Sequence, residues 1–358
     1  MIAELIIQWY HSHRRDLPWR NTQDPYRIWV SEVILQQTRV EQGRAYYERF
    51  LQKFPDVFAL AAAREQDVLL LWQGLGYYSR ARNMHRAARQ VVDDFNGVFP
   101  DSYKKLLTLK GVGAYTAAAI ASFAFKKSHP AIDGNVNRVV ARLFNIQVPV
   151  NAPEGGKAIK QCTEAIFTPA MPDLFNQAMM EFGALHCTAR NPACQTCPVK
   201  EHCLAYADNA VHLLPAKKKK RAPSKRYLNY LVISGSSSET LYLTKRENPR
   251  DIWYNLYEFP LIESKEPLTA QQLTGREAFR KLSGNGNVVI EKMQGPVKHQ
   301  LSHQTLFVYF WEISFDNEKN LRDDALKTPY HQLDEYPFPR LISAFVEENF
   351  PEYIKKLK

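Results

Sequence analysis

Four of the chain's five cysteines lie in one short stretch, CTARNPACQTCPVKEHC (187–203), with six, two and five residues between successive thiols. Thiols spaced this closely can form disulfides, hold structural zinc or hold an iron–sulfur cluster. The start of the chain, MIAELIIQWYHSH, has Glu4 inside its apolar run and no cleavable hydrophobic core. We therefore expect no signal peptide and no disulfides. Zinc and an iron–sulfur cluster both take four thiolates, so ligand count leaves the two open, and Cys162 is interpreted as a small buried apolar residue.

Two carboxylates also stand in unusual surroundings. Glu32 precedes the apolar run Val33–Leu35 in VSEVILQQT (30–38), and Asp133 opens a helical pattern in AIDGNVNRVVARLF (131–144). Taken alone, Glu32 would be a solvent-facing helix carboxylate and Asp133 a helix cap. What raises interest in both positions is the set of other motifs that accompany them in this chain.

A glycine-rich turn gives the third chemical signal. In LKGVGAYTAAAIASFAF (109–125), Gly111 and Gly113 separate two helical patterns. Backbone amides at such a turn and at the following helix N-terminus can receive a phosphate. The pattern favours a helix–hairpin–helix clamp on a DNA backbone, and an ordinary turn with glycine caps is the alternative.

Length, charge and patterning indicate how these residues are carried. The chain has 358 residues, a net charge of +10 and a pI near 9.2, which favours a nucleic-acid partner. Its apolar runs are too short to span a bilayer, so we expect a soluble protein. Helical patterns dominate before the basic run KKKKRAPSKR (217–226), and strand-like patterns such as 227–246 and 304–315 follow it. The prediction is a helical domain at 1–213, a basic linker at 214–226 and an α+β domain at 227–358.

In combination these motifs resemble the endonuclease III superfamily of DNA glycosylases. The shared order is LxGVGxxTA, then DGNVxRVxxR, then the four-cysteine spacing. The resemblance implies an all-α helix–hairpin–helix fold with its hairpin at about 105–125, and a structural 4Fe–4S cluster held by Cys187, Cys194, Cys197 and Cys203. It also makes Arg190, in the cluster loop, a candidate DNA contact.

Three features resemble the MutY-type adenine glycosylases within that superfamily. VSEVILQQT matches their signature, and Tyr115 stands where strand-cleaving relatives have the lysine that forms a Schiff base. The segment LYLTKRENPRDIWYNLYEFP (241–260) is similar to the start of their MutT-like (Nudix-like) C-terminal domain, with Tyr257 in place of a tryptophan. A MutT-type hydrolase needs a glutamate-rich helix for magnesium, but REAFRKLSG (276–284) carries Arg280 and Lys281 instead. The second domain is therefore interpreted as a recognition module.

The resemblance implies a monofunctional hydrolase that removes adenine opposite 8-oxoguanine or guanine. Glu32 would be the general acid and base, and Asp133 would stabilise the sugar cation. Its other implied site residues fall into four groups: Tyr115 and Asn135 organising the active site; Trp19, Arg20, Leu35 and Gln177 lining the adenine pocket; Gln37, Tyr77, Gly111 and Gly113 binding DNA; and Leu301, Ser302 and His303 reading 8-oxoguanine, with Leu301 replacing the family's phenylalanine.

Two alternatives remain open. One is an endonuclease III-type glycosylase for oxidised pyrimidines, against which Tyr115 and the second domain argue. The other is a catalytically silent DNA-binding scaffold, against which Glu32 and Asp133 argue. We expect a cytoplasmic monomer that binds double-stranded DNA, associated with the nucleoid if the source is bacterial, and no membrane partner.

Overall fold

The computed structural model describes residues 1–218, 222–234, 239–283, 288–315 and 325–353. Two compact units are present. The helical unit comprises Met1–Ala63 and Ser79–Lys219, and the C-terminal unit comprises Arg64–Tyr78 and Lys220–Lys358. The boundary near residue 219 falls inside the predicted basic linker, but sequence patterning gave no sign that residues 64–78 would group with the C-terminal unit. Among the described residues, no helix has the length and apolar character needed to cross a bilayer.

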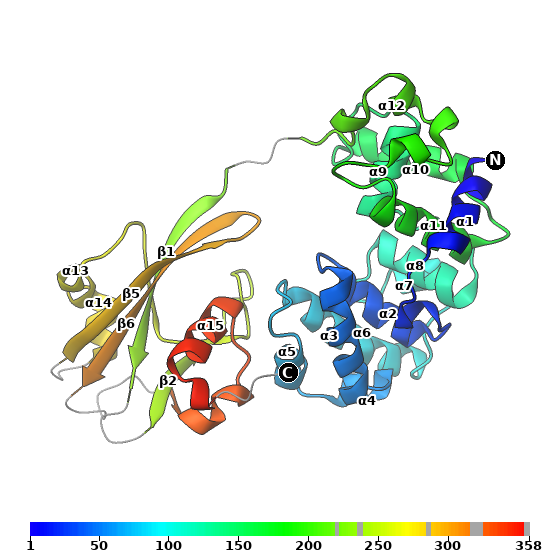
Figure 1. Ribbon diagram of the computed structural model, residues 1–358. Coiled ribbons are helices and arrows are strands. Elements are labelled where there is room, and N and C mark those ends of the chain that lie inside the picture. The colour runs from blue at the N-terminus through cyan, green and yellow to red at the C-terminus, as the bar shows by residue number, and fades with distance from the viewer. Residues whose placement is uncertain (219–221, 235–238, 284–287, 316–324, 354–358) are drawn as a thin grey trace. The chain divides into compact units, whose positions relative to one another are not determined.

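The helical unit is all-α, as predicted (Figure 1). Its helices are α1 (Ile2–His13), α2 (Pro25–Leu35), α3 (Val40–Lys53), α4 (Val57–Ala62), α6 (Ser79–Phe95), α7 (Tyr103–Leu106), α8 (Ala114–Phe125), α9 (Gly134–Leu143), α10 (Pro153–Ile166), α11 (Pro172–Leu185) and α12 (Leu204–Ala207). One core cluster joins α1, α9, α10 and α11 through residues such as Ile6, Val140, Ile159 and Phe182. This packing fixes α9 and α11, whose side chains line the site described below.

Two helices separated by a short turn occupy most of the segment 30–54. Helix α2 ends at Leu35 and α3 begins at Val40. Between them Gln37 adopts a left-handed backbone with φ of 60°. Asp24 caps the start of α2 by accepting from the Tyr26 amide, and Pro25 takes the first helical position, where a missing N–H costs nothing. Helix α2 buries Glu32 along with its apolar residues.

The predicted hairpin lies between α7 and α8. Gly111 has φ of +78°, a backbone conformation that favours glycine. A Cβ at Gly111 would also lie 2.6 Å from Asn83 Cβ. Gly113 is the N-cap of α8 with extended backbone, and the Ala-rich helix that follows is buried from Thr116 to Phe123. The two glycines thus differ in their structural roles: Gly111 adopts the turn conformation, and Gly113 caps the start of α8.

The described residues of the C-terminal unit form two sheets, in agreement with the predicted α+β class. One has the strand order β4-β1-β6-β5 and the other the order β3-β2-β7. The strands are β1 (Ser224–Ile233), β2 (Thr240–Lys245), β3 (Tyr257–Glu258), β4 (Leu261–Ser264), β5 (Val288–Gln300), β6 (Gln304–Phe315) and β7 (Leu326–Pro329). The helices are α5 (Glu65–Leu71), α13 (Ala270–Thr274), α14 (Glu277–Ser283) and α15 (Arg340–Asn349).

Strand β1 carries the core of this unit on both of its faces. Leu228, Tyr230 and Val232 belong to one buried cluster and Leu231 and Ile233 to another, as the two-residue period of a strand requires. Helix α15 packs on the first cluster, and α13 and α14 pack on the second (Figure 1). The two strands expected at 227–246 both form, but β1 and β2 lie in different sheets, and residues 235–238 of the expected turn lie outside the described residues.

Candidate functional site

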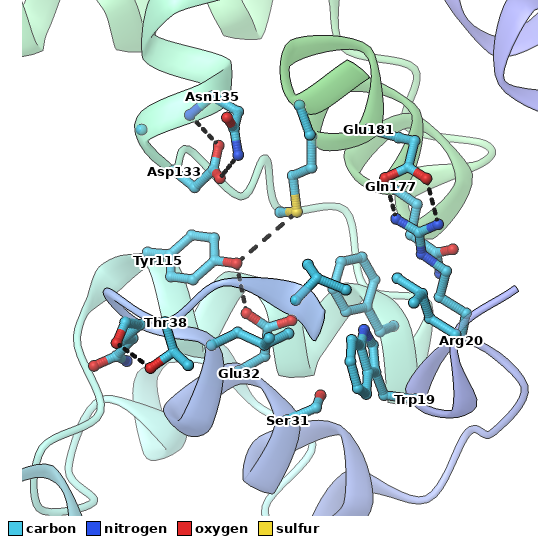
Figure 2. A pocket seen from close by; sticks show the side chains of 18 of the residues that line it. Trp19, Arg20, Ser31, Glu32, Thr38, Tyr115, Asp133, Asn135, Gln177 and Glu181 are labelled. Carbon is cyan, nitrogen blue, oxygen red and sulfur yellow. Dashed lines mark hydrogen bonds and ion pairs between the residues drawn. The ribbon is translucent and has the colours of Figure 1, made fainter. Parts of the chain in front are cut away.

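A cavity of about 590 Å³ opens in the helical unit. Helices α2, α8, α9 and α11 and the short turn of 3₁₀-helix at Pro18–Arg20 contribute its walls. Figure 2 shows Glu32 and Tyr115 on one side, Asp133 and Asn135 on another, and Gln177 and Glu181 beside Arg20 and Trp19. The site therefore combines an apolar wall with several converging polar groups, which is typical of a ligand pocket.

Glu32 is a buried carboxylic acid that lines this cavity. Glu32 is only 8% exposed, and its Oε2 accepts a hydrogen bond from the Tyr115 hydroxyl at 2.5 Å. Burial raises the pKa of Glu32 to about 7, and the negative charge of Asp133 acts in the same direction, while the Tyr115 hydrogen bond opposes them. The alternative interpretation of Glu32 as a solvent-facing helix carboxylate is thus excluded by its burial. Near neutral pH, a substantial fraction of Glu32 is protonated.

Asp133 is held by the start of α9. Its Oδ1 accepts from the Asn135 amide at 2.9 Å and the Val136 amide at 2.7 Å, and its Oδ2 accepts from Asn135 Nδ2 at 2.7 Å. Burial raises the pKa of Asp133, and these three donors oppose that rise by stabilising the ionised form. Both readings of Asp133 therefore apply: it is a helix cap, and it also lines the cavity with Glu32.

A buried ion-pair cluster forms the opposite wall. Glu181 is fully buried, and it accepts hydrogen bonds from the guanidinium groups of Arg15 and Arg20 at 2.7–3.0 Å. Burial alone would raise the pKa of Glu181, but the Arg20 and Arg15 hydrogen bonds outweigh it and lower the pKa to about 2. The Arg20 side chain, predicted for the adenine pocket, is thereby fixed in one orientation.

The cavity brings together most of the predicted active-site residues. Those on its wall are Trp19, Arg20, Glu32, Leu35, Gln37, Tyr115, Asp133, Asn135 and Gln177. The hairpin glycines and Arg190 lie in the same unit outside this wall, and Tyr77, Leu301, Ser302 and His303 belong to the C-terminal unit.

Sequence reasoning missed Glu181, Arg15 and Met180, which also line the cavity. A signal for Glu181 was present: it lies four residues after Gln177 in α11, and residues four apart share one helix face. A carboxylate between Met180 and Phe182 also indicates an acid placed next to apolar packing. Nothing in the sequence pairs Glu181 with Arg15, which is 166 residues away.

The four clustered cysteines line a second, small cavity of about 30 Å³. All four carry free thiols, and Arg142 Nη1 donates to Cys187 Sγ at 3.3 Å. Within the described ranges, no three His, Cys, Asp or Glu residues form a group that could hold a metal ion. The thiols instead surround a cavity, and His186 Nε2 on its wall is buried with no hydrogen-bond partner among the described atoms. Four thiol donors around one pocket, with cationic and imidazole groups beside them, fit a multi-atom iron–sulfur cluster.

The predicted lesion-reading residues form the tip of the β5–β6 hairpin. Ser302 and His303 are exposed, and Leu301 packs against the buried cluster beneath them. The Leu301 amide donates to the Gln304 carbonyl at 2.8 Å, and the Ser224 amide donates to the His303 carbonyl at 3.1 Å. The loop is therefore tied at its base and presents two polar side chains to solvent.

Three family models match the sequence. They are the HhH-GPD superfamily base excision DNA repair protein over residues 30–154, the iron-sulfur binding domain of endonuclease III over 187–203, and the NUDIX domain over 229–348. These matches confirm the predicted fold class and the predicted 4Fe–4S cofactor of the loop at 187–203.

Curated relatives and solved structures agree with this result. An adenine DNA glycosylase of Buchnera aphidicola is 35% identical over 308 residues, which cover 85% of this chain and 84% of the relative. The Mus musculus adenine DNA glycosylase is 42% identical over 210 residues, covering 56% of this chain and 41% of the relative. A thermostable thymine-DNA glycosylase structure is 30% identical with a TM-score of 0.54, covering 58% of this chain and 95% of that one. An endonuclease III–DNA complex, at 21% identity and a TM-score of 0.51 over 58% of this chain and 94% of that one, shares the fold. The chain therefore belongs to the adenine DNA glycosylase family, within the helix–hairpin–helix base-excision repair superfamily.

Proposed function

We propose that this protein removes adenine from DNA by hydrolysing its N-glycosidic bond, acting as a monomer on adenine opposite 8-oxoguanine or guanine. The observation that carries the proposal is the pair of carboxylates that line one cavity. Glu32 has a pKa raised to about 7 by burial, and three N–H donors stabilise the ionised form of Asp133 against the rise in pKa that burial causes. Two carboxyl groups with opposed protonation states are what glycosidic-bond hydrolysis requires.

The chemistry begins with the leaving base. Protonated Glu32 transfers its proton to adenine N7, and the bond from N9 to the sugar then breaks with its electron pair moving onto the base. The sugar becomes cationic, and the Asp133 carboxylate stabilises it or traps it covalently. Water adds to the sugar carbon and gives its proton to the Glu32 carboxylate, which restores the starting state.

The remaining wall groups position this exchange. The Tyr115 hydroxyl holds Glu32 Oε2, and Asn135 holds Asp133 Oδ2. Arg138 Nη2 in turn donates to Asn135 Oδ1 at 2.8 Å, so Asn135 itself has a fixed orientation. A tyrosine at position 115 has no amine with which to form an imine, so we propose that the enzyme has no strand-cleaving lyase step.

Adenine must leave the duplex before this chemistry can occur. We propose that Gln37 and Tyr77 hold the opened base stack, that Gly111 and Gly113 present amides to the backbone, and that Arg190 adds a phosphate contact. Trp19, Arg20, Leu35 and Gln177 would receive the flipped base. Ser302 and His303 would hydrogen-bond the 8-oxoguanine on the opposite strand, with Leu301 packing beneath them. The cluster, when bound, would stabilise the loop that carries Arg190.

The test is base excision by wild type and Glu32→Gln on duplexes carrying adenine opposite 8-oxoguanine, guanine or thymine. We expect the wild type to release adenine from the first two duplexes and to spare A·T. We expect Glu32→Gln to bind the same duplexes but to release adenine at a rate at least about 100-fold lower. Release of oxidised pyrimidines instead, with a covalent adduct trapped by borohydride, would favour an endonuclease III-type activity. Binding without any excision would favour the scaffold alternative.

A second comparison tests the lesion reader. Ser302→Ala combined with His303→Ala should lower the preference for 8-oxoguanine over guanine opposite the adenine. An unchanged preference in this double variant would contradict the reader role and would leave adenine excision itself intact. Lys281→Ala, on the exposed surface of α14 in the same unit, is the matched control.

A further inference from the structure

The C-terminal unit contains one segment that lies far from the rest of it in sequence. Residues Arg64–Tyr78 group with Lys220–Lys358, and this segment carries Tyr77. Tyr77 is 53% exposed and has φ of 47°, a left-handed backbone that is uncommon for a bulky residue. Gly74 and Gly76 before it have φ of 96° and 70°. A large aromatic ring presented on a strained loop needs surrounding contacts that hold it there.

Both flanks of Tyr77 are hydrogen-bonded to the main chain of one residue. The Phe338 amide donates to Gln73 Oε1 at 3.1 Å, and the Tyr78 hydroxyl donates to the Phe338 carbonyl at 3.0 Å. Phe338 is 2% exposed and belongs to the buried cluster that underlies α15. Its backbone is therefore a rigid point of attachment for the loop.

Two further bonds hold the helix that leads into this loop. Gln66 Nε2 donates to the Glu335 carbonyl at 2.7 Å, and Asn255 Nδ2 donates to Glu65 Oε1 at 2.6 Å. Glu65 and Gln66 are the first two residues of α5. The segment is thus attached at the start of its helix and on both sides of Tyr77.

We propose that the main chain of Phe338, through Gln73 and Tyr78, is a clamp that sets Tyr77 in position for insertion into the base stack. Gln73 and Tyr78 are positioning residues in this assignment, and the inference rests on the proposed function for the wedge role of Tyr77. The C-terminal unit then contributes to DNA engagement twice, by reading the lesion at Ser302 and His303 and by holding the wedge.

The test uses the full-length protein and a duplex with 2-aminopurine beside the base opposite the target adenine, since this probe brightens when its stacking is broken. Tyr78→Phe removes only the hydroxyl that reaches Phe338. The matched control is Tyr26→Phe in the helical unit, which removes a buried hydroxyl donating to the Phe54 carbonyl at 2.7 Å. Gln73→Ala removes the second attachment.

We expect Tyr78→Phe and Gln73→Ala each to weaken binding to the mispaired duplex by about three- to tenfold and to reduce the 2-aminopurine signal. Tyr26→Phe should lower the melting temperature about as much as the two clamp variants do, but it should leave the 2-aminopurine signal at the wild-type level. A wild-type signal in both clamp variants would overturn the clamp. If Tyr77→Ala also keeps the wild-type signal, the wedge and the clamp both fail, whereas continued adenine release by the wild type shows that the proposed function stands.

Discussion

At the scale of single residues, Glu32 couples catalysis to a cost in stability. Because burial raises its pKa to about 7 from an ordinary 4.5, the folded state disfavours the carboxylate. This penalty is absent below about pH 4.5 and grows as the pH rises toward 7. We expect adenine release to fall about tenfold per pH unit above about pH 7, because the proton donor is lost.

We also expect Glu32→Gln to increase the free energy of unfolding by up to about 3 kcal/mol at pH 8 and by much less at pH 5. Denaturant titrations at both pH values measure this, and equal differences at the two would contradict it.

Glu181 contributes a pH dependence of stability opposite in sign to that of Glu32. The Arg20 and Arg15 hydrogen bonds lower its pKa to about 2, so the ion pairs contribute stability above about pH 4.5 and lose it as the pH falls toward 2. Glu181→Leu would leave two arginines facing a cavity without their partner. We expect this variant to lose about 3 kcal/mol of unfolding free energy at pH 7. Urea titrations should show the difference narrowing as the pH falls toward 2, and a difference independent of pH would argue against the ion pairs.

The residue-level site was partly predictable. The carboxylate pair and the four cysteines were identified from short sequence motifs, in which the residue types and their spacing can be read without knowing the fold. Glu181 with Arg15 could not be found in this way, because their pairing is made by the packing of α1 and α11.

At the scale of elements, Asp133 is a helix cap and a candidate catalytic group at once, and two substitutions separate these roles. Asn is as good an N-cap as Asp, so Asp133→Asn should cost less than about 1 kcal/mol of stability but lower adenine release by at least about 100-fold. Asp133→Ala should lose the cap as well, for about 1 kcal/mol more. Thermal melts and single-turnover rates measure the two effects. A stable and active Asp133→Asn would remove the need for a charge at this position.

Element types were readable from sequence, while their breaks and partners were not. The strand at 304–315 and the α8 helix follow from strong local patterns. The break between α2 and α3 depends on a left-handed Gln37, a conformation that no glycine signalled. Strands β1 and β2 are neighbours in the chain, yet β1 pairs in parallel with β6, because that arrangement buries both of its faces.

At the scale of the whole molecule, the cluster cavity joins distant parts of the helical unit. Cys187, Cys197 and Cys203 pack against the core of α1, α9, α10 and α11, and Cys203 is the N-cap of α12. We expect Cys197→Ser to lose the visible absorbance near 400 nm typical of such clusters, and to lower unfolding free energy because binding free energy contributes to folding. Glu32 should keep its environment, since it lies on the other cavity. Full absorbance in this variant would contradict four-thiol ligation.

The assignment of residues 64–78 to the C-terminal unit changes what truncation of this chain would measure. Stopping the chain at residue 218 would remove Ser302 and His303, but also Asn255, Glu335 and Phe338, which hold the segment carrying Tyr77. We therefore expect the truncated protein to lose amide protection at residues 64–78 in hydrogen exchange, and to excise adenine more slowly opposite guanine as well as opposite 8-oxoguanine. The Ser302 and His303 double variant should be slower mainly opposite 8-oxoguanine and should keep that protection. The truncated protein could instead behave like the double variant, with slower excision mainly opposite 8-oxoguanine and with amide protection kept at residues 64–78. In that case the helical unit alone would hold the segment, and the C-terminal unit would act only as a reader.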